Sequence, residues 1–251
     1  MLAENGDLDN DGHRDDGRLH VIDCSNPLYP SGKTYDLSGR ATGIFADKQY
    51  AYVTDVRQGL NIIDISDISS IYREGLYHTR DLARKVFVLG EYAYVITGES
   101  ELKVIDVSNP SAPYEKEYLD INGYVTDIFV SEHYAFVTDT SNGLVIINLS
   151  LLWDTVSLQL SGYRECVFFS DGKAYIGTRL DLDNDGVYES GRLYVINIFK
   201  PAFTMESGNT DPFNQTLCMY SLLYAGCTNS YNISGADSCS RFLYYSVNTG
   251  M

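Results

Sequence analysis

The chain of 251 residues is long enough for one large all-β domain or two smaller ones, with a sizeable buried core. Asp and Glu outnumber Lys and Arg by 34 to 18, so the net charge of −16 would repel phosphate backbones and anionic membranes, and no nucleic-acid partner is expected. No apolar run approaches the roughly 20 residues of a membrane-spanning helix, so membrane insertion is not expected either.

The first predicted element is an acidic hairpin, and it occurs twice. Residues 7–23 read DLDNDGHRDDGRLHVID and residues 181–197 read DLDNDGVYESGRLYVIN, which agree at 11 of 17 positions. Each copy begins as an acidic stretch with a glycine and ends as an alternating apolar strand. We therefore expect an acidic loop between two strands of a hairpin in both places.

One strand motif recurs through the chain from the first hairpin onward. A second motif, YAYV or a variant of it, precedes four of its copies, at residues 50, 92, 134 and 173. A repeat of about 42 residues with four short strands is the size of one propeller blade, because one such sheet buries both faces only when neighbours stack on it. The recurring motif reads LHVID, LNIID, LKVID, LVIIN and LYVIN, at steps of 41, 42, 42 and 49 residues, and starts at Leu19, Leu60, Leu102, Leu144 and Leu193.

Within each unit we expect four antiparallel strands, which we name A to D. The A strands are expected near residues 42–47, 85–90, 126–131 and 166–171, and the B strands at the YAYV motifs. The C strands carry the LNIID motif, and KEYLDI, residues 116–121, is typical of the D strands. The 21 Tyr and 10 Phe agree with this assignment, because aromatic side chains pack well on pleated sheets.

The string LKVIDVSNPSAPYEKEYL, which starts at Leu102, resembles the LVIVD repeat, as do its weaker copies LHVIDCSNPLYP and LNIIDISDISSIY. The resemblance extends over roughly residues 18–200. It implies a β-propeller and an extracellular or cell-surface location, since proteins with this repeat are bacterial and archaeal surface or secreted proteins. The family has no established catalytic residues, so the resemblance assigns none. Asn148 and Asn197 replace the motif Asp in the last two copies.

The first unit is incomplete, because only MLAENGD precedes its acidic loop. Met219–Gly226 is a candidate A strand for this unit, and Arg241–Gly250 is a candidate B strand that would pair with Leu19–Asp23. The predicted fold is an all-β, five-bladed β-propeller of four-stranded antiparallel blades, in a single domain of residues 1–251 with clear repeats up to residue 200. One blade would then combine strands from both termini and remove open sheet edges. The alternative is exchange of these strands with a neighbouring molecule, which would propagate into a polymer.

The acidic loops follow the spacing D-x-D-x-D-G-x-x-D/E and resemble the calcium loops of integrin-type propellers. Alternate carboxylates converge on one ion, and the glycine allows the turn that brings in the next carbonyl; such hard oxygen ligands suit Ca²⁺. The alternative is a solvated acidic loop without metal. The expected ligands are Asp7, Asp9, Asp11, the carbonyl of His13 and Asp15 in one loop, and Asp181, Asp183, Asp185, the carbonyl of Val187 and Glu189 in the other.

No other pattern indicates catalysis. The four histidines have no metal-ligand spacing, and the chain has no nucleophile elbow and no phosphate-binding glycine loop. Several other carboxylates recur at equivalent strand ends, which favours turn or cross-strand hydrogen bonds over catalysis. These carboxylates are Asp55, Asp64, Asp106, Asp127 and Asp139.

Two further groups of residues concern covalent processing. Of the three N-x-S/T sequons, those at Asn214 and Asn232 lie in the loop-rich tail and are candidate glycosylation sites, whereas Asn148 lies at a strand end. Three of the five cysteines, Cys218, Cys227 and Cys239, crowd the last fifth of the chain, where a disulfide and free buried thiols both remain open.

Two functions remain open. The first is a non-enzymatic, calcium-binding scaffold or adhesion module on a cell surface or in a matrix, with itself, surface glycans or other proteins as partners. The second is an enzyme or carbohydrate-binding protein with a site at the mouth of a central channel. Polar residues that differ between blades would favour a site, and repeated ones a scaffold. The turns between A, B and C are mostly repeated, which favours the scaffold.

Overall fold

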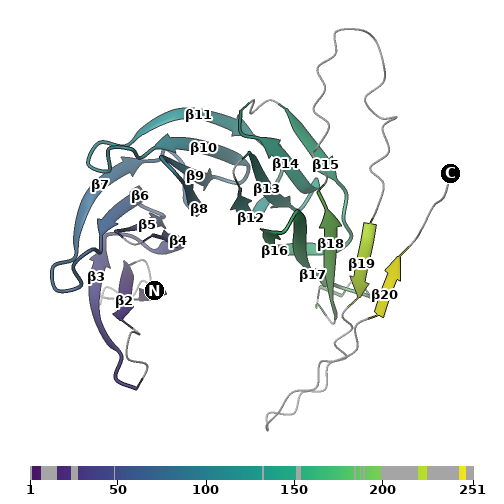
Figure 1. The fold of residues 1–251 in the computed structure, drawn as a ribbon, viewed down its shortest axis with the longest axis horizontal. Coiled ribbons are helices and arrows are strands. Elements are labelled where there is room, and N and C mark those ends of the chain that lie inside the picture. Colours follow the sequence, from purple (N-terminus) through teal and green to yellow (C-terminus); the bar gives the residue numbers. More distant parts are fainter. Residues whose placement is uncertain are drawn as a thin grey trace. The chain divides into compact units, whose positions relative to one another are not determined.

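The computed structural model describes residues 2–6, 16–23, 28–47, 49–131, 133–150, 154–183, 185, 186, 188, 190–198, 220–224 and 243–246. In these residues every regular element is a β-strand (Figure 1). None of the described segments forms a helix with the length and apolarity needed to cross a bilayer. The chain divides into two compact units, residues 1–132 and 133–251, and each is described by itself.

The first unit contains three antiparallel sheets and one further strand, β12 (Val125–Val130). The first sheet has the order β1-β2-β3, with β1 (Leu2–Gly6), β2 (Asp16–Asp23) and β3 (Ser31–Leu37). The second has the order β4-β5-β6-β7, with β4 (Ala41–Ala46), β5 (Tyr50–Asp55), β6 (Gly59–Asp64) and β7 (Tyr72–His78). The third has the order β8-β9-β10-β11, with β8 (Ala83–Leu89), β9 (Tyr92–Thr97), β10 (Glu101–Asp106) and β11 (Tyr114–Asp120).

The core of this unit lies between stacked sheets, as a propeller repeat requires. Residues of β5 and β6 alternate in the face to which they point, so both faces of the second sheet are buried. Val53 and Ile63 pack against Leu19 of the first sheet. On the opposite face, Leu60 and Ile62 pack against residues of the third sheet. The apolar runs YAYV and LNII are therefore central strands buried on both sides.

The A strands carry a repeated aromatic row. The ring centroids of Phe45 on β4 and Phe87 on β8 are 4.9 Å apart, and those of Phe87 and Phe129 on β12 are also 4.9 Å apart. Both β4 and β8 have a register shift near their start, between Ala41 and Gly43 and at the matching place in β8. Such a bulge re-aims the side chains next to it.

The second unit contains the sheet strands β13 (Tyr134–Asp139), β14 (Gly143–Asn148) and β15 (Thr155–Leu158), paired in that order. It also contains a five-stranded antiparallel sheet in chain order, β16 (Tyr163–Ser170), β17 (Lys173–Leu180), β18 (Ser190–Asn197), β19 (Tyr220–Tyr224) and β20 (Leu243–Ser246). Phe136 is fully buried and stacks on Phe169 of β16, with ring centroids 4.4 Å apart. The guanidinium of Arg164 joins the same two sheets through hydrogen bonds of 2.9 and 2.7 Å to the carbonyl oxygen of Asp139.

The strand pattern predicted from the repeats is confirmed. The expected A strands correspond to β4, β8, β12 and β16, and the B and C strands that follow them form antiparallel pairs in register. The expected D strand at residues 116–121 lies within and just after β11. Gly59 and Gly143 end their B-to-C turns with φ of +105° and +83°, which explains the glycine in RQG and SNG.

The expected pairing of Arg241–Gly250 with Leu19–Asp23 is wrong. Strand β1 pairs with β2 from Leu2↔His20 to Gly6↔Asp16, so the N-terminal residues themselves occupy the B position of the first sheet. Strand β3 occupies the other edge of β2, so no edge of β2 is left for a further strand. Strand β20 instead pairs with β19, from Ser221↔Ser246 to Tyr224↔Leu243.

The expected role of Met219–Gly226 as an A strand is also wrong. A strand does form there, but β19 pairs with β18, from Leu193↔Leu223 to Ile196↔Tyr220. It therefore takes the position of a D strand in the last sheet. The physical reason is that β18 exposes an unpaired edge which the next available strand of the chain satisfies.

Candidate functional site

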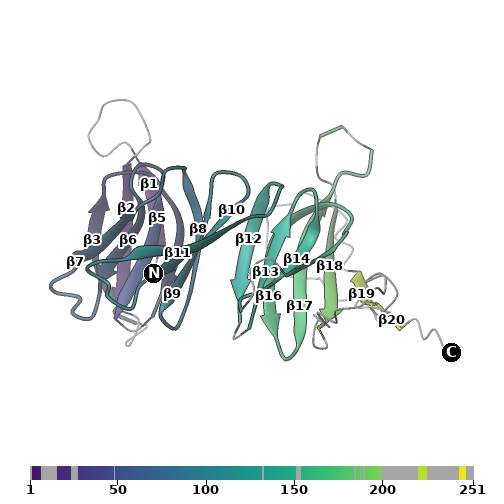
Figure 2. The same ribbon diagram turned by 90° about the horizontal axis from the view of Figure 1, so that it is seen from above.

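The second acidic loop joins β17 to β18, as its sequence position predicts, and extends from the ends of these two strands (Figure 2). The last cross-strand pair before the loop is Leu180↔Ser190. Because this pair closes the hairpin, both ends of the loop are fixed by a sheet. The loop residues that follow Leu180 are therefore held near one another rather than spread along a strand.

Three carboxylates converge in this loop. One carboxylate oxygen from each of Asp181, Asp183 and Asp185 lies within 4.8 Å of the others. Among the described residues this is the one group of three or more His, Cys, Asp or Glu side chains arranged closely enough to hold an ion. Asp181 is partly buried, and Asp183 and Asp185 are exposed.

The backbone turn holds these carboxylates in place. Gly186 has φ of +87°, a conformation that favours glycine, and its N–H donates a 2.9 Å hydrogen bond to Oδ2 of Asp181. The N–H of Asp185 donates a 3.3 Å hydrogen bond to Oδ1 of Asp183. The other carboxylate oxygen of Asp181, Oδ1, is buried and has no hydrogen-bond partner in the described part of the chain. A cation or a water molecule can compensate the lost hydration of such a buried carboxylate oxygen.

The donor set fits a hard cation. The three converging side chains offer carboxylate oxygens, which Ca²⁺ prefers and binds in flexible number. Val187 and Glu189, the remaining predicted ligands of this loop, lie outside the described residues. The whole first loop, with Asp7, Asp9, Asp11, His13 and Asp15, also lies outside them. The two strands that flank the first loop, β1 and β2, nevertheless pair as a hairpin.

The carboxylates at strand ends serve in turns, as predicted. Oδ1 of Asp55 accepts hydrogen bonds of 2.8 and 2.6 Å from the backbone N–H groups of Arg57 and Gln58, and Asp139 holds its turn in the same way. Asp64 and Asp106 each accept from the N–H and hydroxyl of a serine two residues later, and these serine hydrogen bonds hold the pKa of both carboxyl groups below its usual value.

Asp127 does not belong to this group. It lies inside β12, so its predicted place at a strand end is wrong. Its Oδ1 is 3.3 Å from Nζ of Lys85 on β8, an ion pair between neighbouring A strands. The sequence spacing suggested equivalence with Asp55 and Asp139, but those residues end B strands and Asp127 is in an A strand.

A polar network that the sequence reading missed lies between the second and third sheets. Nζ of Lys103 is 2.9 Å from Oε2 of Glu115 and 3.1 Å from Oε2 of Glu101, and the Lys103 side chain is 8% exposed. The hydroxyl of Tyr77, on β7, donates a 2.7 Å hydrogen bond to the same Glu115 oxygen. The network therefore joins two repeats through one buried cation.

Burial and pairing oppose each other in this network. Burial alone would lower the pKa of Lys103, but its hydrogen bonds and ion pairs with Glu115 and Glu101 outweigh burial and raise it. Burial alone would raise the pKa of Glu115, but hydrogen bonds from Tyr77 and Lys103 hold it below its usual value. Both groups are therefore charged near neutral pH, and the network contributes to stability rather than to proton transfer.

The remaining predicted residues are not brought together. His20 lies on β2, His78 ends β7 and His133 precedes β13. Cys166 is an exposed free thiol on β16, and Asn148 ends β14. The candidate glycosylation sites Asn214 and Asn232 and the tail cysteines Cys218, Cys227 and Cys239 lie outside the described residues.

Comparison with known families identifies the repeat. The sequence model of the LVIVD repeat matches residues 38–79, 82–120 and 122–151, which supports the predicted repeat in these three segments. The first two segments each contain one complete four-stranded sheet, β4–β7 and β8–β11. No curated protein sequence matches the chain.

Solved structures show the fold. The β-propeller domain of Cps50 (Swd1) from Myceliophteria thermophila is similar with a TM-score of 0.54 and 13% identity, over 73% of this chain and 60% of that one. A functionally unknown protein from Desulfotomaculum acetoxidans has a TM-score of 0.54 and 10% identity, over 73% of this chain and 62% of that one. Apo AztD from Citrobacter koseri has a TM-score of 0.47 and 12% identity, over 74% of this chain and 55% of that one. The chain spans less than two thirds of the length of these proteins. The two structures with a TM-score of 0.54 show that it has the β-propeller fold.

Proposed function

We propose that the chain is a non-catalytic, calcium-binding β-propeller that acts as an extracellular or cell-surface scaffold or adhesion module. The observation that carries the proposal is the convergence of carboxylate oxygens of Asp181, Asp183 and Asp185 within 4.8 Å of one another. One oxygen of Asp181, Oδ1, is also buried and has no hydrogen-bond donor among the described residues. The match to the LVIVD repeat within residues 38–151 supports the surface location, because proteins with this repeat are surface or secreted proteins. The role of the ion in this proposal is structural.

Charge explains why an ion would stabilise the loop. Three carboxylates so close together repel one another, and the loop has no apolar core of its own. A bound Ca²⁺ would neutralise this repulsion and fix the loop between β17 and β18. The same argument applies to the first loop, whose sequence agrees with the second at 11 of 17 positions.

The scaffold assignment rests on how the polar residues of the repeat are used. The carboxylates at strand ends accept turn hydrogen bonds, and the Lys103 network pairs a buried cation with two carboxylates. These groups are engaged in holding the structure, which leaves none of them oriented for acid or base catalysis. The proposal therefore assigns no catalytic residue to the chain.

We propose five blades, of which the sheet β1-β2-β3 is the incomplete one. In the described residues it has three strands, one fewer than the sheets β4–β7 and β8–β11, and β1 is an edge strand of it. A further strand, in the same molecule or from a neighbouring one, would complete it and remove an exposed edge. Size-exclusion chromatography with light scattering tests completion by a neighbouring molecule, and the particle mass of a single chain at every protein concentration would refute it.

Calcium should raise the thermal stability of the protein. An ion at about 100 times its dissociation constant stabilises a folded protein by about 2.7 kcal/mol, which corresponds to about 5–10 °C for a chain of this size. We expect a shift of that order between EGTA and millimolar Ca²⁺ in thermal unfolding followed by circular dichroism. The double variant Asp183→Asn/Asp185→Asn should show a clearly smaller shift, because one of the two loops loses its ligands.

The control is Asp171→Asn, which removes an exposed carboxylate in the turn before β17, in the same sheet but outside the loop. It should keep the full calcium shift. If wild type shows no shift, or if the double variant and the control respond alike, calcium binding by residues 181–189 is ruled out.

A further inference from the structure

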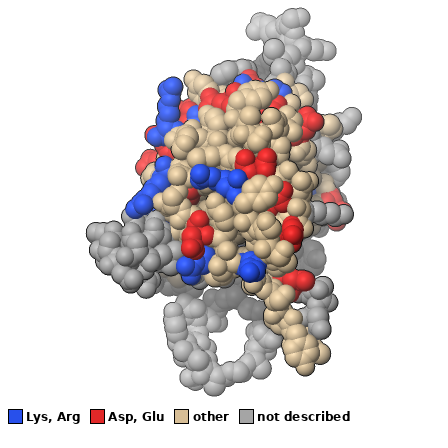
Figure 3. Space-filling view, turned by 90° about the vertical axis from the view of Figure 1, so that its left-hand side faces the viewer, with Lys and Arg blue, Asp and Glu red and all other residues tan. Residues whose placement is uncertain are grey.

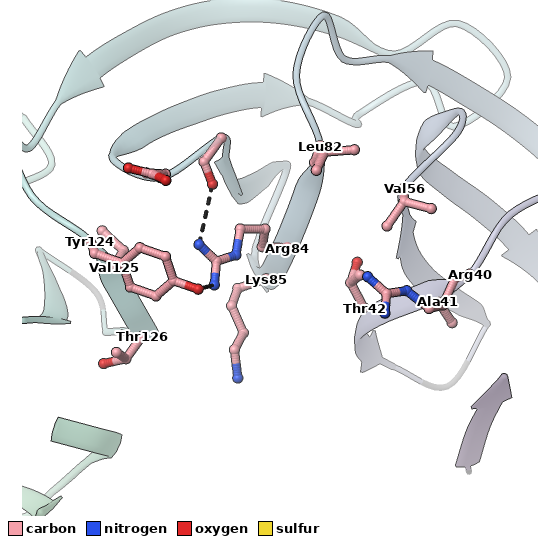
Figure 4. Close-up of a pocket in the computed structure, with 12 residues that line it drawn as sticks. Arg40, Ala41, Thr42, Val56, Leu82, Arg84, Lys85, Tyr124, Val125 and Thr126 are labelled. Atoms are coloured by element: carbon pink, nitrogen blue, oxygen red, sulfur yellow. Dashed lines mark hydrogen bonds between the residues drawn. The ribbon is translucent and has the colours of Figure 1, made fainter. Parts of the chain in front are cut away.

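A cavity of about 580 Å³ lies along the A strands of the first unit (Figure 4). We call it the inner-strand cavity and define it by Arg40 and Thr42 at β4, Arg84 and Lys85 on β8, Glu99 in the β9–β10 turn, and Tyr124 before β12. Its volume lies within the range of about 300–1,000 Å³ that is usual for small-molecule sites. None of the predicted calcium ligands contributes to it.

The charge of this cavity is opposite to that of the protein. Three cationic side chains, Arg40, Arg84 and Lys85, line it together with one carboxylate, Glu99, although the chain as a whole has a net charge of −16. On the face shown in Figure 3, by contrast, basic and acidic side chains are interspersed. Since screening limits surface charge effects to about 8–10 Å, local cations rather than the net charge determine what this cavity attracts.

Arg84 is held in one orientation by its neighbours. Its guanidinium carbon lies 4.1 Å from the centre of the Tyr124 ring, over the ring face. One of its nitrogens donates a 3.4 Å hydrogen bond to the carbonyl oxygen of Gly98, and another donates to the Tyr124 hydroxyl (Figure 4). A guanidinium fixed in this way offers its remaining donors to a ligand with little further loss of side-chain entropy.

The guanidinium of Arg40, unlike that of Arg84, is not held by neighbouring side chains of the described residues. Its side chain is exposed and forms no hydrogen bond or ion pair with another described residue, whereas its backbone carbonyl accepts a 3.1 Å hydrogen bond from the N–H of Val56. The backbone at this arginine is thus fixed while its guanidinium remains open to a ligand. A guanidinium matches the two oxygens of a carboxylate or a phosphate by forming paired hydrogen bonds.

The cationic residues are specific to individual repeats. Arg84 occupies the bulge position of β8, where β4 has Thr42 and β12 has Thr126. Lys85 occupies the next position, where β4 has Gly43 and β12 has Asp127. The neighbouring Phe45, Phe87 and Phe129, by contrast, repeat without change. The fold requires the repeated phenylalanine row in these repeats. Charged residues that differ between repeats beside this row are what a ligand site would require.

We propose that the inner-strand cavity binds a small organic anion that carries a carboxylate or phosphate group. The anionic group would be recognised by Arg40 and Arg84, whereas Lys85 is ion-paired with Asp127. Val56, Leu82 and Val125 supply apolar wall for the carbon skeleton of the ligand. This binding is separate from the calcium loops and does not depend on them.

The test is calorimetric titration with three ligands that share one sugar ring, D-glucuronate, D-glucose 6-phosphate and D-glucose, in buffer with EGTA. Because a charge-assisted hydrogen bond is worth about tenfold in affinity, at least one anionic sugar should bind about tenfold more tightly than glucose. Its affinity should fall as NaCl is raised. The better of the two anionic sugars identifies whether carboxylate or phosphate is the preferred group.

Variants locate the site. Arg40→Gln and Arg84→Gln should each weaken binding of the anionic sugar by about fivefold or more, since each removes a charged donor. The matched control is Lys33→Gln on β3, which removes one exposed positive charge outside the cavity and should leave the affinity unchanged. Arg40 is exposed, so its variant should fold normally. The proposal is overturned if neither anionic sugar binds, if glucose binds equally well, or if Arg40→Gln behaves like Lys33→Gln.

Discussion

Replacing Phe136 by alanine is expected to lower the free energy of unfolding by about 3–5 kcal/mol, the range for buried Phe→Ala substitutions. The Phe136 side chain is 0% exposed and stacks on Phe169 with an angle of 12° between the rings. It lies in the middle of β13, opposite Ile146 of β14, so the surrounding strands cannot close the space. Urea unfolding followed by circular dichroism measures the loss.

The control for this substitution is Phe168→Ala on β16. Phe168 is 55% exposed, so its replacement should cost about 1 kcal/mol or less. Equal losses in the two variants would mean that the ring of Phe136 is not part of a packed core between β13 and β16.

The second large effect is expected at the Lys103 network. Lys103→Met removes a buried cation and leaves Glu101 and Glu115 facing each other without it, which should cost about 3 kcal/mol, as breaking a buried ion pair does. Combining it with Glu115→Gln should restore part of the loss, since the amide no longer carries an unpaired charge and its oxygen still accepts from Tyr77. Lys116→Met, on the neighbouring strand β11 and exposed, is the control and should cost less than about 1 kcal/mol.

The pH dependence of this effect follows from the two pKa shifts. The pKa of Glu115 is lowered in the folded protein, so its contribution is present above the unfolded value of about 4.3 and is lost as the pH falls through the folded value. The pKa of Lys103 is raised, so its contribution is present below about 10.4 and is lost as the pH rises through the folded value. The difference in stability between wild type and Lys103→Met should therefore be constant near neutral pH and shrink below about pH 4 and above about pH 10. A difference that does not change on acidification would contradict the assignment.

The strands of the repeats could be predicted because their signal is local. Alternation of apolar residues and the glycine-containing turns are both written within a few residues, and the structure places β5, β6, β9 and β10 at these motifs. The partners of the terminal strands could not be predicted in the same way. LAENG has no apolar alternation, yet Leu2–Gly6 forms a strand because β2 offers it an edge with unpaired backbone groups.

The candidate sites differ in the same respect. The acidic loop is a contiguous motif, and its three described carboxylates converge as the D-x-D-x-D spacing predicts. The Lys103 network and the inner-strand cavity combine side chains from different repeats, such as Tyr77 with Glu115 and Thr42 with Arg84, which lie 38 and 42 positions apart. One signal was available in the sequence. Lys103 is the one lysine at this position of the motif, where the other copies have His20, Asn61, Val145 and Tyr194, and a buried lysine there requires acidic neighbours.

Titration of Ca²⁺ into the EGTA-treated and dialysed protein, followed by isothermal calorimetry, tests the proposed role of the acidic loops most directly. We expect two ions per chain, one for residues 7–15 and one for residues 181–189, and one ion in Asp183→Asn/Asp185→Asn. Absence of binding, or an unchanged number of ions in that variant, would contradict a calcium-stabilised propeller.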